Sequence, residues 1–134
     1  MENHYFQRWE IEGIANVKYD IDNVSWKKEG FIVSIFTDER LSDKSDQSDQ
    51  KLQLIWEPGS VISYHVTDET YRSDCWGLDF ERNGRFYATK ASKYIDEIKD
   101  KSPLVPEEVI HFTIIGTNTI VDLLAKSYPE VRKL

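Results

Sequence analysis

Residues 31–36 read Phe-Ile-Val-Ser-Ile-Phe, and this run constrains the fold more than any other segment. Successive side chains of a strand point to opposite faces of a sheet, so a strand that is apolar in both alternations must be covered on both sides. Ser34 is the single polar residue of the run. The run therefore predicts a central strand, and other elements must cover its second face.

Several other segments alternate apolar and polar residues, as half-buried strands do. Three such segments are 5–12, 51–57 and 61–67, and residues 109–115 form a further run that is apolar in both alternations. Pro58-Gly59 and Asn83-Gly84 are typical turn sequences and stand between segments of this kind. The pattern predicts a mostly antiparallel sheet connected as a meander.

Two helices are expected near the C-terminus. Ser92 is placed to cap a helix that runs to about Lys101. Thr119 and Asp122 match a loose capping box, which predicts a second helix that ends before Pro129. The predicted fold class is α+β, with about six antiparallel strands and two C-terminal helices packed on one face, in the order β-β-β-β-β-β-α-β-α.

The chain of 134 residues, 40% of them hydrophobic, is expected to form one α+β domain over residues 1–134. Residues 41–50 are the exception, because they read Leu-Ser-Asp-Lys-Ser-Asp-Gln-Ser-Asp-Gln and contain no apolar residue after Leu41. Such a segment buries too little surface to offset the entropy of ordering it. We expect a flexible acidic loop there.

The chain is acidic, with 17 Lys and Arg against 24 Asp and Glu and a net charge of −7. This charge repels nucleic-acid phosphates and anionic lipid headgroups, so neither nucleic acid nor a membrane is an expected partner. A basic protein would complement it. No apolar run is long enough to cross a bilayer, the N-terminus does not resemble a signal peptide, and Cys75 is the single cysteine, so a cytoplasmic protein is expected.

Motifs of common enzyme classes are missing from the sequence. It contains no Gly-x-Ser-x-Gly segment, and its six glycines stand singly, so neither a serine-hydrolase elbow nor a phosphate-binding loop is predicted. Cys75 lies near Asp74 and Asp79, whose negative charges disfavour a reactive thiolate. We therefore expect a binding protein rather than an enzyme, and no cofactor.

Two histidines support an alternative from another class. His65, Asp68 and Glu69 lie within five residues, and His111 is on a later predicted strand. Such residue types can hold zinc or iron, but this spacing is not that of a known metal motif, and no metal is predicted. The alternative is a small-molecule-binding, metal-binding or enzymatic pocket between sheet and helix, formed by His65, His111 and Tyr64. Neighbours in a strand face opposite ways, which separates Tyr64 from His65.

The preferred prediction is a non-enzymatic acidic module that binds another protein, such as a regulatory or immunity-type protein that engages a basic partner. Acidic residues and one tyrosine in predicted loops are its candidate contacts, because ordered surface loops often carry binding functions. These partner-binding candidates are Asp38, Glu39, Asp68, Glu69 and Tyr71. Trp26 stands among polar residues and is either the start of the central strand or an exposed anchor.

Overall fold

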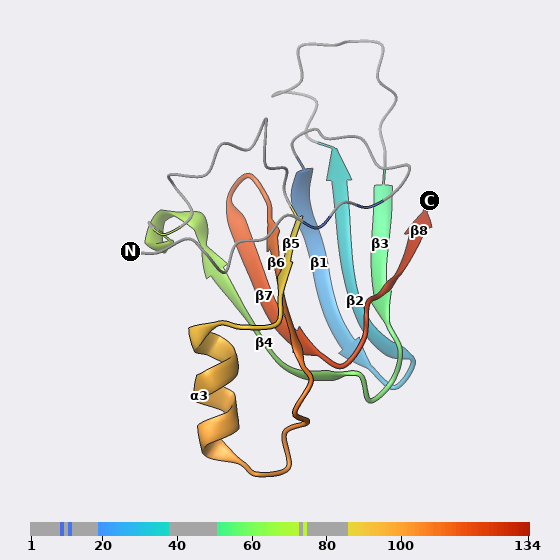
Figure 1. Cartoon of the computed structure of the whole chain (residues 1–134). Coiled ribbons are helices and arrows are strands. Elements are labelled where there is room, and N and C mark those ends of the chain that lie inside the picture. Colours follow the sequence, from blue (N-terminus) through green and yellow to red (C-terminus); the bar gives the residue numbers. More distant parts are fainter. Residues whose placement is uncertain (1–8, 10, 12–18, 38–50, 73, 75–85) are drawn as a thin grey trace.

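A computed structural model describes residues 9, 11, 19–37, 51–72, 74 and 86–134 (Figure 1). The expected acidic loop at 41–50 and the Asn83-Gly84 turn lie outside the described residues. Within them the chain forms eight strands, one α-helix and one short 3-10 helix. These elements are β1 (Tyr19–Lys27), β2 (Gly30–Thr37), β3 (Lys51–Trp56), β4 (Val61–Asp68), η2 (Glu69–Tyr71), β5 (Phe86–Thr89), α3 (Lys93–Lys101), β6 (Ile110–Ile115), β7 (Thr119–Ala125) and β8 (Glu130–Lys133).

The strands form two four-stranded sheets, in which every pair of neighbours is antiparallel. The first sheet has the order β1-β2-β3-β8 and the second has the order β4-β7-β6-β5. The sheets pack face to face, and the main core fills the space between them. From the first sheet the core takes alternate residues of β2 and β3, and from the second it takes alternate residues of β6 and β7, among them Phe31, Val33, Leu54, Trp56, Phe112, Ile114, Val121 and Leu123.

The expectation of about six strands and two C-terminal helices is wrong. Residues 119–125 form strand β7 rather than a helix, and α3 is the single α-helix among the described residues. The physical reason is burial on both faces, because six of the seven residues of β7 are fully buried, and Ile120 and Val121 are β-branched. A strand between β4 and β6 satisfies that pattern, with Val121 and Leu123 facing the first sheet and Leu124 facing α3.

The expected meander is interrupted where the chain passes from one sheet to the other. Pro58 and Gly59 do form a turn, in which Gly59 has a φ of 83° and the Ser60 amide bonds the Glu57 carbonyl at 3.1 Å. This turn leads from β3 of the first sheet to β4 of the second, so the two strands do not pair. The return crossing from β7 to β8 lies beside it, since the Lys126 amide bonds the Ser60 carbonyl at 3.0 Å.

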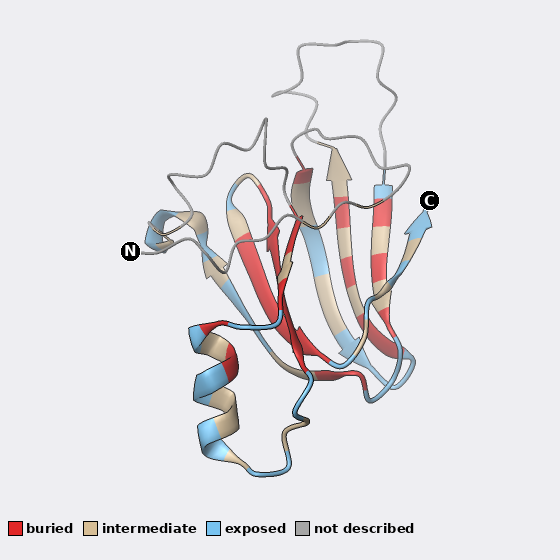
Figure 2. Cartoon of the chain, in the orientation of Figure 1, coloured by how far each residue is buried: buried red, intermediate tan, exposed pale blue. Residues whose placement is uncertain are grey.

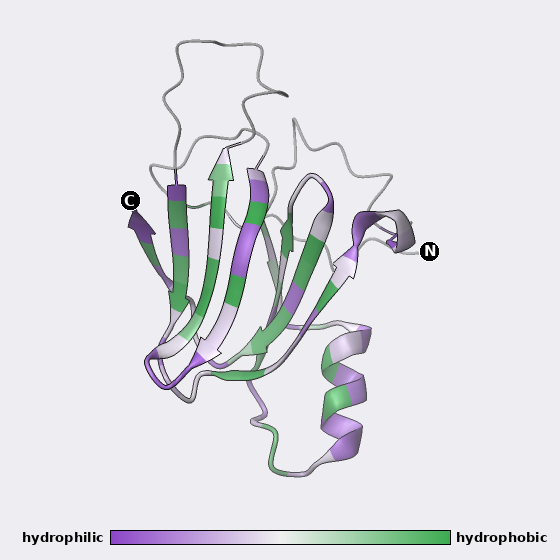
Figure 3. Cartoon of the chain, turned by 180° about the vertical axis from the view of Figure 1, so that it is seen from behind, coloured by the Kyte–Doolittle hydropathy of each residue, from purple (hydrophilic) through white to green (hydrophobic). Residues whose placement is uncertain are grey.

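The run at residues 31–36 is a central strand, as predicted, because β2 lies between β1 and β3. Apolar and polar bands alternate along the first part of β3 (Figure 3), and Leu52, Leu54 and Trp56 face the core. The outer face of the first sheet, which points away from the second, is half-buried at Ile32 and Phe36. No described helix covers it, because α3 packs on the second sheet.

The helix predicted after Ser92 is confirmed as α3. The Ser92 hydroxyl accepts a hydrogen bond from the amide of Ile95 at 3.2 Å, which caps the first turn. Tyr94, Ile95 and Ile98 pack against Val109 and Leu124 on the outer face of the second sheet, the face turned away from the first sheet. Among the described residues, no helix is both long and apolar enough to span a membrane.

Candidate functional site

Three of the five predicted contact residues lie together at one end of β4. Asp68 is the last residue of β4, and Glu69 and Tyr71 belong to η2, the turn that follows (Figure 1). Asp38 and Glu39 lie outside the described residues. Tyr71 has 80% of its surface exposed, which is far more than packing in a core allows. The candidate site therefore starts at the turn η2.

Hydrogen bonds hold the backbone of η2 in place. The Asp68 carboxylate accepts the Thr70 amide at 2.9 Å, and this bond lowers the pKa of Asp68 below its usual value. The Glu69 amide donates to the Asn118 carbonyl at 3.0 Å, which joins the turn to the connection between β6 and β7. The Arg72 amide donates to the Glu69 carbonyl at 3.1 Å. The turn is thus fixed at both ends.

The side chain of Arg72 anchors the turn to the sheet. Its guanidinium makes two bonds to the Asp74 carboxylate, at 2.9 and 3.0 Å, and a third to Asp122 on β7. A planar guanidinium that holds two carboxylates in this way fixes its own orientation. The Arg72 and Asp74 side chains are both largely buried. Tyr71 therefore precedes a residue whose side chain is held in place on both sides.

Asp122 is the centre of a buried polar cluster on the outer face of the second sheet. Its side chain is 1% exposed, and one carboxylate oxygen accepts from His111 Nε2 at 2.7 Å and from Thr113 Oγ1 at 2.8 Å. The other oxygen binds Arg72 and faces His65 Nδ1 at 3.8 Å. We call these groups the Asp122 cluster, which consists of Asp122, His111, Thr113, Arg72, Asp74 and His65.

Asp122 is ionised in this setting. Burial alone would raise the pKa of Asp122, but the hydrogen bond from His111 and the charge of Arg72 outweigh it and hold that pKa below its usual value. An ionised carboxylate only accepts hydrogen bonds, so His111 carries a proton on Nε2. The guanidinium of Arg72 is the cation that pairs with this buried carboxylate, as a buried charge requires.

The two histidines that the sequence singled out do converge on one group. His65 lies directly opposite Asp122 in the pairing of β4 with β7, and its side chain is half exposed. Tyr94 of α3 stands between them, with its ring centroid 4.7 Å from that of His65 and 5.2 Å from that of His111. Tyr64 is not part of this group, because it faces the first sheet and lies 4.9 Å from Phe31 between ring centroids.

A chain of hydrogen bonds links α3 to Asp122 through His111. The Ser92 hydroxyl lies 2.8 Å from His111 Nδ1, and the opposite ring nitrogen bonds Asp122. Serine, histidine and aspartate also form hydrolase triads, but there the serine is open to substrate. Ser92 is buried, and its oxygen already caps α3. These hydrogen bonds therefore tie α3 to the second sheet. Ser92 is not placed to attack a substrate.

Sequence reasoning missed Asp122 as a site residue because it assigned this residue to a helix. A polar residue inside the apolar run Ile120 to Leu124 was the available signal, since a carboxylate at such a position has to find buried partners. The register then explains the cluster. His65, Asp122, Thr113 and Tyr87 lie in one row across the four strands of the second sheet.

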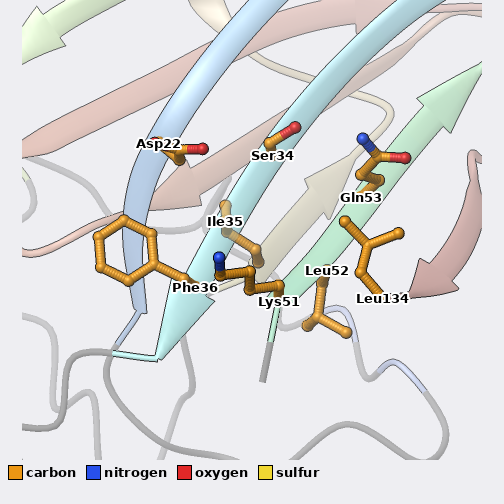
Figure 4. Close-up of a pocket in the computed structure, with 8 residues that line it drawn as sticks. All are labelled: Asp22, Ser34, Ile35, Phe36, Lys51, Leu52, Gln53 and Leu134. Atoms are coloured by element: carbon orange, nitrogen blue, oxygen red, sulfur yellow. The ribbon is translucent and has the colours of Figure 1, made fainter. Parts of the chain in front are cut away.

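The described residues give no support to the alternative of a metal-binding site. In the part of the chain that the structure describes, no three His, Cys, Asp or Glu residues are grouped so that they could hold a metal ion. A shallow groove of about 450 Å3 does exist, on the outer face of the first sheet (Figure 4). Its polar lining comes from Asp22, Ser34, Lys51 and Gln53, and it contains none of the predicted site residues.

Comparison of the chain with protein-family models, with curated proteins and with solved structures finds no match. The functional interpretation therefore rests on the geometry of this chain.

Proposed function

We propose that the chain is a protein-binding module, and that its contact surface is centred on η2 with Asp68, Glu69 and Tyr71. The observation that carries the proposal is the exposure of Tyr71 on a turn that Arg72 clamps to buried Asp122. Tyrosine is enriched at binding hot spots, because it offers a large contact area and loses little conformational entropy. A preorganised turn lowers the entropic cost of binding further.

The charge around Tyr71 determines the kind of partner. Asp68 and Glu69 precede it directly, and the whole chain carries a net charge of −7. Complementary charge speeds association and selects partners, so a basic protein surface is the proposed complement. Asp68 is the more informative acid to change, because asparagine keeps the cap on Thr70 and removes only the charge.

The test is capture of partners by the tagged full chain from an extract of its own cells. We expect one stoichiometric basic protein with the wild type, and a loss of about 2 kcal/mol, or about 30-fold in Kd, with Tyr71→Ser. Asp68→Asn should weaken binding mainly at low salt. Leu104→Ser is the matched control, because Leu104 is an 89% exposed apolar residue after α3. Equal capture by all four proteins would overturn the proposal.

A second candidate function is a small-molecule site at His65. It is favoured by the half-exposed imidazole, whose Nδ1 lies 3.8 Å from the buried Asp122 carboxylate, because histidine can donate or accept a proton from a ligand near neutral pH. A thermal-shift screen of metabolites distinguishes the two functions. A large shift that His65→Gln abolishes and Tyr71→Ser leaves intact would favour this candidate.

A further inference from the structure

The edges of the two sheets differ in how they are protected. Natural proteins block exposed edge strands with charges, prolines or bulges, because a bare edge pairs with other chains. In the first sheet, β1 has a register shift between Ile21 and Asn23 and β8 has three charged residues out of four. In the second sheet, the Phe86 carbonyl of β5 accepts the Trp9 amide at 2.8 Å. Each of these three edges therefore carries a protecting feature.

Strand β4 lacks these features over most of its length. Its register shift lies at the start, between Val61 and Ser63, and from there to Asp68 its pairing with β7 is continuous. Residues 63–67 read Ser-Tyr-His-Val-Thr and contain no lysine, arginine, acid or proline. None of the described strands pairs with the edge of β4 that faces away from β7. Figure 2 shows the contrast between β4, whose residues are exposed or intermediate along most of its length, and the buried strands β7 and β6.

An apolar strip lies along this edge and ends at η2. Tyr64 and Val66 point to the same side of β4, and Val66 is 47% exposed. Trp26 extends the strip, because it is half exposed and its ring centroid lies 5.6 Å from that of Tyr64. Phe31 supports both rings from the core, at 5.8 Å and 4.9 Å. The strip is therefore an apolar surface supported from the core, with the acidic residues Asp68 and Glu69 following it along the chain.

We propose that β4 binds an extended segment of the partner as an added strand. In this mode main-chain hydrogen bonds provide affinity, and alternate side chains provide specificity. Apolar side chains at alternate positions of the segment would lie on Trp26, Tyr64 and Val66, and a lysine or arginine at its end would meet Asp68 and Glu69. This inference rests on the proposed function and names the recognition mode of the same surface.

The charges favour a partner over a second copy of this chain. β4 contains no lysine or arginine, so antiparallel pairing of two copies would place each Asp68 beside the first half of the other β4, where it meets no opposite charge. Each copy also carries a net charge of −7, and the two copies would repel each other. A basic extended segment would instead be attracted by the net charge and would supply an opposite charge for Asp68.

The test uses a display library of random decapeptides selected on the full chain. We expect enriched peptides to alternate apolar and polar residues and to carry Lys or Arg at one end. Binding of the synthetic form of the most enriched peptide should fall at least about tenfold with Val66→Lys, because an edge lysine blocks strand pairing. Leu104→Lys makes the same charge change elsewhere and should have no effect. Alternate amides between Ser63 and Asp68 should exchange more slowly with the peptide bound.

Several other outcomes would overturn the inference. No enrichment, enriched peptides without alternation, or unchanged binding to Val66→Lys would overturn strand addition. Binding that is lost with Tyr71→Ser but kept with Val66→Lys would leave the turn as the contact site and overturn the role of the β4 edge. Slow exchange of the same amides in a dimer of the chain without peptide would assign the edge to a second copy and also overturn the inference.

Discussion

The guanidinium of Arg72 binds the carboxylate of Asp122, although the two residues lie 50 positions apart in the sequence. This bond joins an exposed turn to a buried residue on the outer face of the second sheet. Arg72 follows Tyr71 directly, so the bond helps to hold the backbone that carries the exposed tyrosine. The proposed contact surface at η2 depends on this bond.

Replacing Arg72 with lysine tests the clamp without changing the exposed residues. Lysine keeps the charge but cannot hold Asp74 and Asp122 at once in a fixed geometry. We expect the affinity for the captured partner to fall about tenfold, or about 1.4 kcal/mol, although Tyr71 is intact. Calorimetric titration measures this change. The control is Arg132→Lys, which alters an exposed pair with Glu130 at 2.7 Å. Equal affinities for the two variants would argue against the clamp.

Asp122→Ala should be strongly destabilising. It leaves Arg72 and His111 buried without their shared acceptor, and breaking a buried ion pair costs about 3–5 kcal/mol in the free energy of unfolding. Urea unfolding followed by tryptophan fluorescence measures the change. Glu130→Ala removes an acid from the exposed pair and should cost less than about 0.5 kcal/mol. A loss below about 1 kcal/mol for Asp122→Ala would show that the cluster contributes little.

The lowered pKa of Asp122 predicts a sign for the pH dependence of stability. A carboxyl group whose pKa is lower in the folded chain stabilises the fold at pH values above its unfolded pKa, about 4, and this contribution is lost as the pH falls through the folded value. The difference in free energy of unfolding between the wild type and Asp122→Asn should therefore shrink between pH 6 and pH 3. Urea unfolding at several pH values checks this, and a constant or growing difference would contradict it.

Ser92 has two tasks, and its loss should cost about 2 kcal/mol. Ser92→Ala removes the cap on the Ile95 amide and leaves His111 Nδ1 without its partner. Ser102→Ala is a suitable control, because it removes an exposed bond to the Leu104 amide at the other end of α3. Thermal unfolding of both variants compares the two positions. Similar melting temperatures would mean that the link between α3 and β6 adds no stability.

Local signals were enough to predict some elements. The capping serine and helical spacing predicted α3, and alternation predicted that Leu52, Leu54 and Trp56 face a core. The same reasoning failed for β7, because the apolar residues on either side of Asp122 fall in both alternations and fit a buried strand as well as a helix. Burial on both faces, which decides the matter, is a property of the assembled sheets.

Only those residues of the candidate site that are close together in the sequence could be predicted. Asp68, Glu69 and Tyr71 are neighbours in the sequence, so their proximity follows directly. The clamp could not be found in this way, because the bond from Arg72 to Asp122 depends on strand order and register. His65 and His111 share Asp122 only because β7 lies between β4 and β6. Each of these relations joins residues distant in the sequence.

Site-specific photo-crosslinking tests the central claim most directly. The full chain carries p-benzoylphenylalanine in place of Tyr71 in one version and in place of Leu104 in another, and both are irradiated in their own cells. Both positions are highly exposed, so nonspecific reaction should be similar. We expect a crosslink to one basic protein from position 71 and none to that protein from position 104. The same products from both positions, or none from position 71, would contradict it.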